Sequence, residues 1–195
     1  MIPGQKFLGK QNMGKSSGKN DPQIYYTHLV GTIDDGTVKH VIEELSIANA
    51  KEYIEEIRLY LSTYGGDLLY AFALYDHIQS SPKPVDIVAE GVCMSAGVMI
   101  LQAARRRYAT EHTLFMVHPS ITNVEEKSYQ EMLQIVDQYK KNHELFIRLS
   151  IDRSGIDKEE FEKIYTPRKY LSASEACSFG KYGLVDQVLE NSTSF

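Results

Sequence analysis

The sequence predicts an α/β fold in which helices cross over between neighbouring strands. Two observations predict this class. Segments rich in β-branched and aromatic residues alternate with segments whose apolar residues recur at helical spacing, and no internal repeat interrupts the alternation. A chain of 195 residues with 43% hydrophobic and 24% charged residues can bury one substantial core. We therefore expect one domain over residues 23–195, with its boundary near Asp21 and Pro22.

The first five elements follow from residue type and periodicity. Valine, isoleucine, threonine and tyrosine mark the strands, whereas the first helix carries Val38, Val41 and Leu45 on one face. Thr37 can cap the first turn of that helix, after a turn at Asp34-Asp35-Gly36. In chain order we expect a strand over 24–33, a helix from about 37, a strand over 57–62, a helix from about 68 that ends near 82, and a strand over 85–89.

The second half of the chain contains one element of unusual length. Apolar residues at Met132, Ile135, Val136 and Phe146 predict a helix over 125–150, which is too long for a compact sheet layer and should project or bridge. Around it we expect strands over 107–109 and 114–117, a helix over 157–165, a helix start near 172, and a final strand over 184–189.

Charge, hydropathy and cysteine content narrow the classes of partner. Lys and Arg total 21 against 26 Asp and Glu, and the net charge of -5 argues against a general nucleic-acid binder. The longest uncharged stretch around Ser95, residues 91–104, is shorter than the ~20 residues of a membrane span, so no membrane partner is expected. Cys93 and Cys177 are the only cysteines, and reduced thiols in a cytoplasmic protein are the simpler interpretation, with an organellar address left open.

The first 22 residues differ in composition from the rest. Residues 1–20 carry four lysines and no acid, with too few apolar residues to offset the entropy of ordering them. Within them, residues 9–16 match the phosphate-binding pattern G-x-x-x-x-G-K-[ST]. That pattern needs a strand before it and a helix after it, whereas residues 17–22 are helix breakers. We expect a flexible basic arm over residues 1–22 rather than a nucleotide site.

Ser95 is the candidate nucleophile. It lies between a predicted strand and a predicted helix in Gly91-Val92-Cys93-Met94-Ser95-Ala96-Gly97, where small residues would leave its hydroxyl exposed beside a helix N-terminus. A serine nucleophile needs a neighbouring base and backbone donors for the oxyanion. His118 follows a predicted strand and can supply the base, and Gly65-Gly66 can approach closely because glycine has no Cβ.

Each of these residues also has an ordinary structural interpretation. Ser95 could be a helix N-cap, His118 a histidine at a strand end, and Gly65-Gly66 a tight turn, although their joint order favours catalysis. Cys93 should pack beneath the Ser95 turn, and Arg105-Arg106-Arg107 should be a solvated helix end. The other histidines lack partners at metal-ligand spacing, so we expect no metal: His28, His40, His77, His112 and His143.

Several short segments carry a resemblance to a known family. In chain order they are Gly31-Thr32-Ile33-Asp34-Asp35, Leu59-Tyr60-Leu61-Ser62-Thr63-Tyr64-Gly65-Gly66, Leu74-Tyr75-Asp76, the Ser95 segment, Met116-Val117-His118-Pro119, Tyr170-Leu171-Ser172-Ala173-Ser174-Glu175-Ala176, and Gly183-Leu184-Val185-Asp186. This order resembles ClpP, the family of proteolytic subunits of the Clp protease, over most of residues 24–190. The resemblance implies the ClpP/crotonase fold, an α/β fold of repeated β-β-α units with a projecting handle helix.

The resemblance also implies roles for individual residues. Ser95 would be the nucleophile and His118 the general base of a serine endopeptidase, with the backbone N–H groups of Gly66 and Ala96 as the oxyanion hole. The chain would form a homo-oligomer of two stacked heptameric rings, a tetradecamer, joined by the handle helix after Asn123. An AAA+ unfoldase would deliver unfolded protein and use the ATP, so this chain would need no cofactor of its own.

One departure from the family pattern affects the third member of the triad. The family has an aspartate two residues before the aromatic residue that corresponds to Tyr170, and this chain has Arg168 there. An arginine cannot accept the Nδ1–H of His118, and its charge opposes imidazolium formation. Removing that carboxylate from a working triad costs ~10⁴ in turnover. Three explanations stay open: Glu162 or Asp157 orients the imidazole, a backbone carbonyl or water does so, or the subunit is slow by itself.

Two smaller departures leave the backbone donors in place. Tyr64 replaces the usual proline before the double glycine and could reshape the substrate groove, and Ala96 replaces a frequent methionine. The main rival function is a catalytically impaired subunit in a mixed ring with an active paralogue, motivated by Arg168. A second rival is crotonase-type acyl-CoA chemistry, which the pairing of Ser95 with His118 disfavours.

Overall fold

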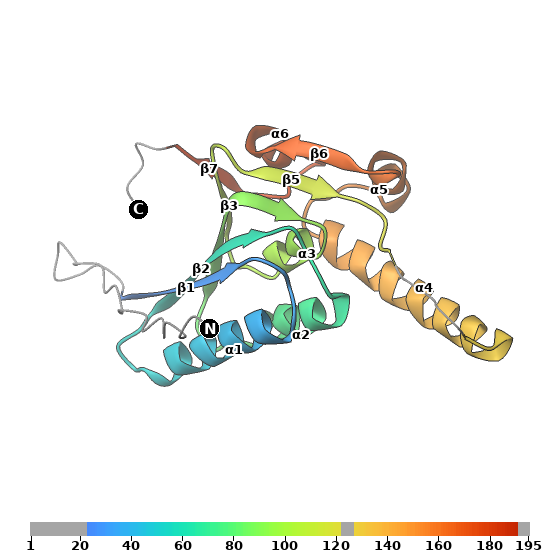
Figure 1. Cartoon of the computed structure of the whole chain (residues 1–195). Coiled ribbons are helices and arrows are strands. Elements are labelled where there is room, and N and C mark those ends of the chain that lie inside the picture. Colours follow the sequence, from blue (N-terminus) through green and yellow to red (C-terminus); the bar gives the residue numbers. More distant parts are fainter. Residues whose placement is uncertain (1–22, 122–126, 191–195) are drawn as a thin grey trace, which may run out of the picture.

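The computed structural model describes residues 23–121 and 127–190, which form one sheet with helices packed around it (Figure 1). The predicted basic arm over 1–22 lies outside the described residues, as does its phosphate-binding pattern. Asn123 and the predicted first residues of the handle helix, 125 and 126, also lie outside them. The predicted α/β class is confirmed by alternating helices and mostly parallel strands.

Seven strands form the sheet in the described residues. They are β1 (Ile24–Val30), β2 (Glu56–Thr63), β3 (Val85–Met94), β4 (Arg107–Thr110), β5 (Leu114–Val117), β6 (Lys169–Ser172) and β7 (Gln187–Leu189). Strands β1, β2, β3, β4 and β7 are neighbours in that order and run parallel. On one side β3 pairs with two strands in turn: residues 87–89 pair with β4, and residues 92–94 pair with β5. β6 then pairs antiparallel with β5. The second half of β3 therefore carries the chain toward β5 and away from β4.

Six helices accompany the strands. They are α1 (Asp35–Ala50), α2 (Leu68–Gln79), α3 (Ala96–Gln102), α4 (Tyr129–Ile151), α5 (Lys158–Tyr165) and α6 (Ala173–Cys177). α1 and α2 lie side by side on one side of the sheet, and α3 contacts both β3 and α4 (Figure 1). The predicted apolar face of α1 is buried, including Val38, Val41 and Leu45. All seven residues of α3 are buried, so the segment that follows Ser95 lies in the core.

Capping side chains and glycines set the observed boundaries of several elements. Thr37 is not the N-cap of α1, because Asp34 accepts from the Thr37 N–H and Thr37 closes a capping box from the N3 position. β1 ends at Val30 rather than at residue 33, since Gly31 takes a φ of +107°. β3 runs five residues beyond its predicted end at Ala89, and β6 was not predicted as a strand.

The long helix α4 projects from the body, as predicted (Figure 1). It begins at Tyr129 rather than at 125, because Ser128 and Glu131 form a capping box. Only its C-terminal part is buried, through Phe146, Ile147, Ser150 and Ile151. The projecting part exposes large apolar side chains at Tyr129, Met132, Leu133 and Val136.

The prediction that Arg105-Arg106-Arg107 is a solvated helix end is wrong for Arg107, which lies buried at the start of β4, whereas Arg105 and Arg106 are exposed. Arg107 is 2% exposed, and its Nε donates to Asp186 at 3.0 Å. Arg105 and Arg106 pair with Asp86, a fully buried carboxylate, at 2.8 Å and 3.1 Å. Each buried charge of this segment thus has a partner, Asp186 for Arg107 and the two exposed arginines for Asp86, as expected because an unpaired buried charge would be costly.

Candidate active site

Ser95 occupies a strained turn between β3 and α3. With φ at 53° and ψ at -123°, it is the only non-glycine residue of positive φ in the described part of the chain. Its N–H donates to the carbonyl oxygen of Met116 at 2.7 Å, which ties the turn to β5. Such backbone strain persists only where surrounding structure enforces it, and it clusters at functional sites. The strand, turn and helix that the sequence predicted around Ser95 are all present.

The side chain of Ser95 faces His118. Ser95 stands at the N-cap position of α3, but its side chain makes no capping hydrogen bond. Its Oγ instead lies 3.0 Å from Nε2 of His118, the first residue after β5. Because β3 and β5 pair in register at Met94 and Met116, the residues that follow both strands meet at the same edge. The structure thus brings together the two side chains that the sequence proposed as nucleophile and base.

The double glycine can pack closely against its neighbours because neither residue carries a Cβ. A Cβ on Gly65 would lie 2.7 Å from the Cβ of Ser95, and a Cβ on Gly66 would lie 2.2 Å from the carbonyl oxygen of Ile33. Ile33 bridges this segment by donating to Gly65 O at 2.9 Å and accepting from Asp67 N–H at 2.8 Å. In such a parallel bridge the middle residue directs its own N–H to the opposite side. The N–H of Gly66 therefore points away from Ile33.

Two backbone donors lie at the cavity beside Ser95. Ala96 is the first residue of α3, and N–H groups in the first turn of a helix have no acceptor within that helix. The cavity has a volume of about 420 Å³, and Gly66 and Ala96 both line it. The full lining is Tyr64, Gly66, Asp67, Leu68, Leu69, Ser95, Ala96, His118, Ser120, Ile121, Tyr139, Asn142 and Phe146. A mixed apolar and polar surface of this size can hold a side chain and the backbone of a peptide.

The imidazole of His118 has a lowered pKa. Burial is the largest cause, while hydrogen bonding to the backbone of Pro119 raises the pKa and the positive charge of Arg168 lowers it. Because proline has no N–H, the Pro119 carbonyl oxygen must be the acceptor. The groups that set the pKa include no carboxylate from the described residues. The imidazole of His118 is therefore neutral at neutral pH. Its hydrogen-bond acceptor is a backbone carbonyl, whereas a triad would have a carboxylate there.

The two acids that the sequence offered as substitutes have other contacts. Asp157 caps α5 by accepting from the Glu159 N–H at 2.8 Å. Glu162 lies 3.8 Å from Lys158 in an exposed ion pair on the same helix. Arg168 itself is exposed, in the short segment between α5 and β6. The contacts given for these two acids join them to other residues of α5.

Sequence reasoning missed a second polar cluster beside the cavity. Ser120, two residues after His118, has its Oγ 3.1 Å from Nδ1 of His143, and the Tyr165 hydroxyl lies 2.7 Å from Nε2 of the same ring. The sequence weighed His143 only as a metal ligand. No spacing pattern joins these residues, and only the position of Ser120 next to the His118 segment could have drawn attention to it.

The remaining chemical candidates have structural explanations. Burial raises the pKa of the Cys93 thiol, so this residue packs as predicted and carries little thiolate. No group of three His, Cys, Asp or Glu side chains in the described residues could hold a metal ion.

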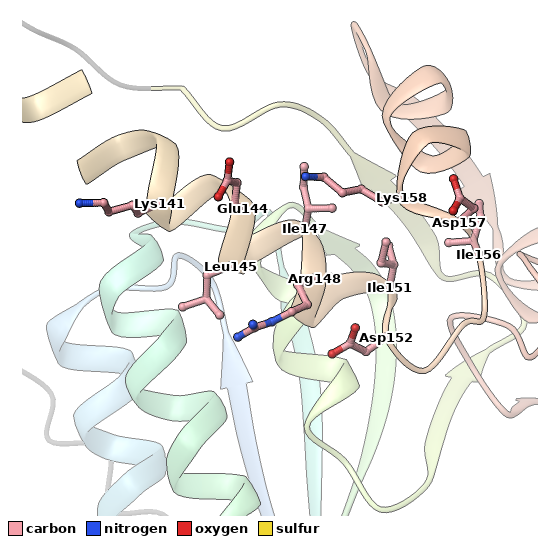
Figure 2. Close-up of a pocket in the computed structure, with 10 residues that line it drawn as sticks. All are labelled: Lys141, Glu144, Leu145, Ile147, Arg148, Ile151, Asp152, Ile156, Asp157 and Lys158. Atoms are coloured by element: carbon pink, nitrogen blue, oxygen red, sulfur yellow. The ribbon is translucent and has the colours of Figure 1, made fainter. Parts of the chain in front are cut away.

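A second cavity of about 610 Å³ lies between α4 and α5 (Figure 2). The ten residues labelled in Figure 2 combine acids, bases and aliphatic side chains and include no serine, cysteine or histidine. Its lining therefore offers no counterpart of the pair formed by Ser95 and His118.

Comparison with known proteins identifies the class. A sequence model described as Clp protease matches residues 23–192, so the chain belongs to the Clp protease family and to the class of ClpP-like peptidases. The chain is similar to the ATP-dependent Clp protease proteolytic subunit 2 of Thermobifida fusca (strain YX). The two are 29% identical over 161 residues, which cover 82% of this chain and 77% of the relative. The predicted family and fold class are confirmed. In the described residues, no helix has the length and hydropathy of a membrane span.

Proposed function

We propose that this chain is a serine endopeptidase subunit that hydrolyses peptide bonds of unfolded proteins through an acyl-enzyme on Ser95. The distance of 3.0 Å between Ser95 Oγ and His118 Nε2, at a strained turn beside a cavity, carries this proposal. Membership of the Clp protease family supports peptidase activity in general.

The geometry supports a two-stage mechanism. Ser95 Oγ attacks the peptide carbonyl carbon while His118 Nε2 takes the hydroxyl proton. The backbone N–H groups of Gly66 and Ala96 stabilise the resulting oxyanion, and each such donor is typically worth about 10²- to 10³-fold in rate. The C–N bond then breaks, and His118 returns the proton to the leaving amine. In the second stage His118 takes a proton from water, which hydrolyses the acyl-enzyme and regenerates Ser95.

The surroundings of His118 favour the neutral imidazole over the charged imidazolium. Its lowered pKa keeps the imidazole unprotonated at neutral pH, as a general base must be. The same burial and the charge of Arg168 oppose the imidazolium that forms as Ser95 attacks. The Pro119 carbonyl can orient the ring but supplies no full negative charge. We therefore expect acylation to be slower than with an acid in the triad, by as much as ~10⁴-fold.

The assembly and the partners form the second part of the proposal. The apolar side chains exposed on the projecting part of α4 provide a surface that a second copy can cover, which supports two stacked heptameric rings. The proteolytic subunit 2 of Thermobifida fusca is described as ATP-dependent. By analogy, a Clp ATPase of the AAA+ class would unfold the substrate, use the ATP and feed the chamber. A cytoplasmic setting belongs to the same proposal and fits the two free cysteines.

A covalent probe tests the catalytic part directly. A fluorophosphonate should add one phosphonyl group to Ser95 with loss of fluoride, seen by intact mass in the wild type but not in Ser95→Ala. His118→Ala should be labelled far more slowly, and the native mass of each protein shows whether the assembly is intact. Labelling that does not depend on Ser95 would contradict the proposal.

Arg168 supports a second candidate function, that of an impaired subunit in a mixed ring. Its charge lowers the pKa of His118 at the position where the family has the orienting acid. An assembled protein that is not labelled alone, but joins a ring with an active paralogue, would establish this alternative. Labelling of the homomeric ring at Ser95 would exclude it.

A further inference from the structure

The imidazole of His143 lies close to the proposed active site without belonging to it. His143 is half-buried on α4, one turn before the part of that helix that packs into the core. Both ring nitrogens have hydroxyl partners, Ser120 Oγ at 3.1 Å from Nδ1 and the Tyr165 hydroxyl at 2.7 Å from Nε2. Hydrogen bonds at both nitrogens hold the ring of His143 in one orientation.

Two tyrosine rings lie nearly parallel to the ring of His143. The ring of Tyr139 lies 6.3 Å from that of His143 with an interplanar angle of 7°, and the ring of Tyr165 lies 6.1 Å away at 21°. The imidazole thus connects three segments, namely α4, the end of α5 and the loop that follows β5. That loop contributes Ser120 alone to the cluster.

A rigid peptide unit links this cluster to the proposed base. The carbonyl of Pro119 and the N–H of Ser120 belong to one planar peptide, so they cannot turn independently. The Pro119 carbonyl accepts the hydrogen bond from the imidazole of His118, and the opposite nitrogen of that ring faces Ser95. Anchoring Ser120 therefore restricts the carbonyl that orients His118.

We propose that His143 is a positioning residue that anchors Ser120, fixes the peptide between Pro119 and Ser120, and so keeps the imidazole of His118 directed at the Ser95 hydroxyl. This inference rests on the proposed function and explains how the ring of His118 is oriented when Arg168 replaces the acid. The anchor acts through the backbone, whereas a triad carboxylate acts through a side chain.

The electrostatic surroundings of His143 suit an uncharged anchor. Burial is the largest cause of its lowered pKa; the charges of Glu162 on α5 and Glu144 on α4 raise the pKa, and Lys158 on α5 lowers it. The Tyr165 pKa is raised to about 12, mainly by burial, so its hydroxyl stays protonated. A neutral imidazole has one donor and one acceptor nitrogen, and hydroxyl groups can complement either arrangement.

The decisive variant is His143→Phe, which keeps an aromatic ring beside the two tyrosines and removes both hydrogen bonds. The readout is the second-order rate of fluorophosphonate labelling at Ser95 in the intact assembly, from about pH 5 to about pH 9. We expect the rate to fall roughly 10- to 100-fold, because small misplacements of catalytic groups have effects of this size. The apparent pKa of the pH profile should also fall, since the bond to the Pro119 carbonyl raises the pKa of His118. A purely structural role would not move this pKa.

Two further variants sharpen the test. His143→Gln offers one donor and one acceptor and should restore most of the labelling rate. Ser120→Ala removes the link itself, and its effect should not add to that of His143→Phe if both break one connection. Ser120→Ala also tests the inference if His143→Phe fails to assemble, because it deletes a single oxygen atom.

The outcomes separate this inference from the proposed function. If wild type is labelled at Ser95 while His143→Phe and Ser120→Ala keep its rate and pH profile, the positioning role is wrong and the peptidase proposal stands. Additive losses in the double variant would also overturn the positioning role. If the assembled wild type is not labelled at all, the proposed function fails first.

Discussion

His118 and His143 are two half-buried histidines whose surroundings lead to different chemistry. In both, burial is the main cause of a lowered pKa, so both rings are neutral at neutral pH. The nitrogens of His143 face Ser120 and Tyr165, and two tyrosine rings lie nearly parallel to its ring. Nε2 of His118 faces Ser95, in the wall of an open cavity.

The comparison shows that a shifted pKa does not by itself distinguish a catalytic histidine from a structural one. What differs is the hydroxyl that each ring faces. Ser95 is held at a positive φ beside two backbone N–H groups, where a substrate carbonyl can bind. Ser120 lies in the loop after β5 beside His143, and among the described residues only Ser95 combines a side chain with a positive φ. In the proposed mechanism the strained turn makes Ser95 reactive, and the imidazole of His118 acts as a base because of this neighbour.

The largest expected effect comes from removing the reactive imidazole. His118→Ala should lower the labelling rate of Ser95 by about 10²- to 10⁴-fold, the usual contribution of a general base. His112→Ala is the matched control, because His112 is exposed in the turn between β4 and β5. Its labelling rate should equal that of the wild type. Equal losses in the two variants would mean that His118 has no special role.

Arg168→Asp should have the next largest effect, in the direction of faster labelling. A carboxylate at this position could replace the Pro119 carbonyl as the acceptor of the His118 N–H and stabilise the imidazolium. The full effect of such an acid in a working triad is ~10⁴-fold, which sets the upper limit for the gain. Arg168→Ala removes only the positive charge and should give a smaller gain. If the aspartate variant is no faster than the alanine variant, position 168 does not reach the ring.

The pH profile of labelling should reveal how the charge of Arg168 affects the pKa of His118. The wild-type rate should be constant at neutral pH and fall as His118 becomes protonated, with a midpoint below its ordinary pKa of about 6.5. In Arg168→Ala the midpoint should move to higher pH, because a positive charge that opposed protonation is gone. A midpoint that stays fixed or moves to lower pH would show that burial and the backbone alone set the pKa.

Tyr165→Phe should have the smallest effect and should act on stability more than on labelling. It removes one hydrogen bond from His143 and leaves the ring stacking and the contact with Ser120 in place. A loss of ~1 kcal/mol is expected, since a net hydrogen bond is worth about that much. Thermal unfolding at fixed protein concentration would measure it. A larger loss of labelling than in Ser120→Ala would reverse the order of importance proposed for the two hydroxyls.

Periodicity was sufficient to predict the fold class. The pairing of Ser95 with His118 was expected from their places after predicted strands and from the family resemblance, and the neighbouring positions of β3 and β5 came only from the structure. The hydrogen-bond partners of the two histidines were harder to predict from the sequence. The partners of His143 lie more than 20 positions away and share no motif.

The burial of Arg107 also could not be predicted from the sequence pattern. Arg107 follows an apolar helix, as a solvated cation would, but its partner Asp186 lies 79 positions away. Helix starts such as those of α1 and α4 depended on which of several polar residues caps the first turn, and Asp34 and Ser128 could be chosen only from the structure.

In the proposed assembly, the projecting part of α4 makes the stability of this protein depend on its concentration. Its helix is supported locally by the Ser128 capping box and by an exposed pair between Lys141 and Asp137, which contributes little. In the proposed assembly a second copy covers Met132, Leu133 and Val136, so the free energy gained there grows with the logarithm of protein concentration. Dilution should therefore loosen this end of α4 first, and amide hydrogen exchange there should quicken before the sheet is affected.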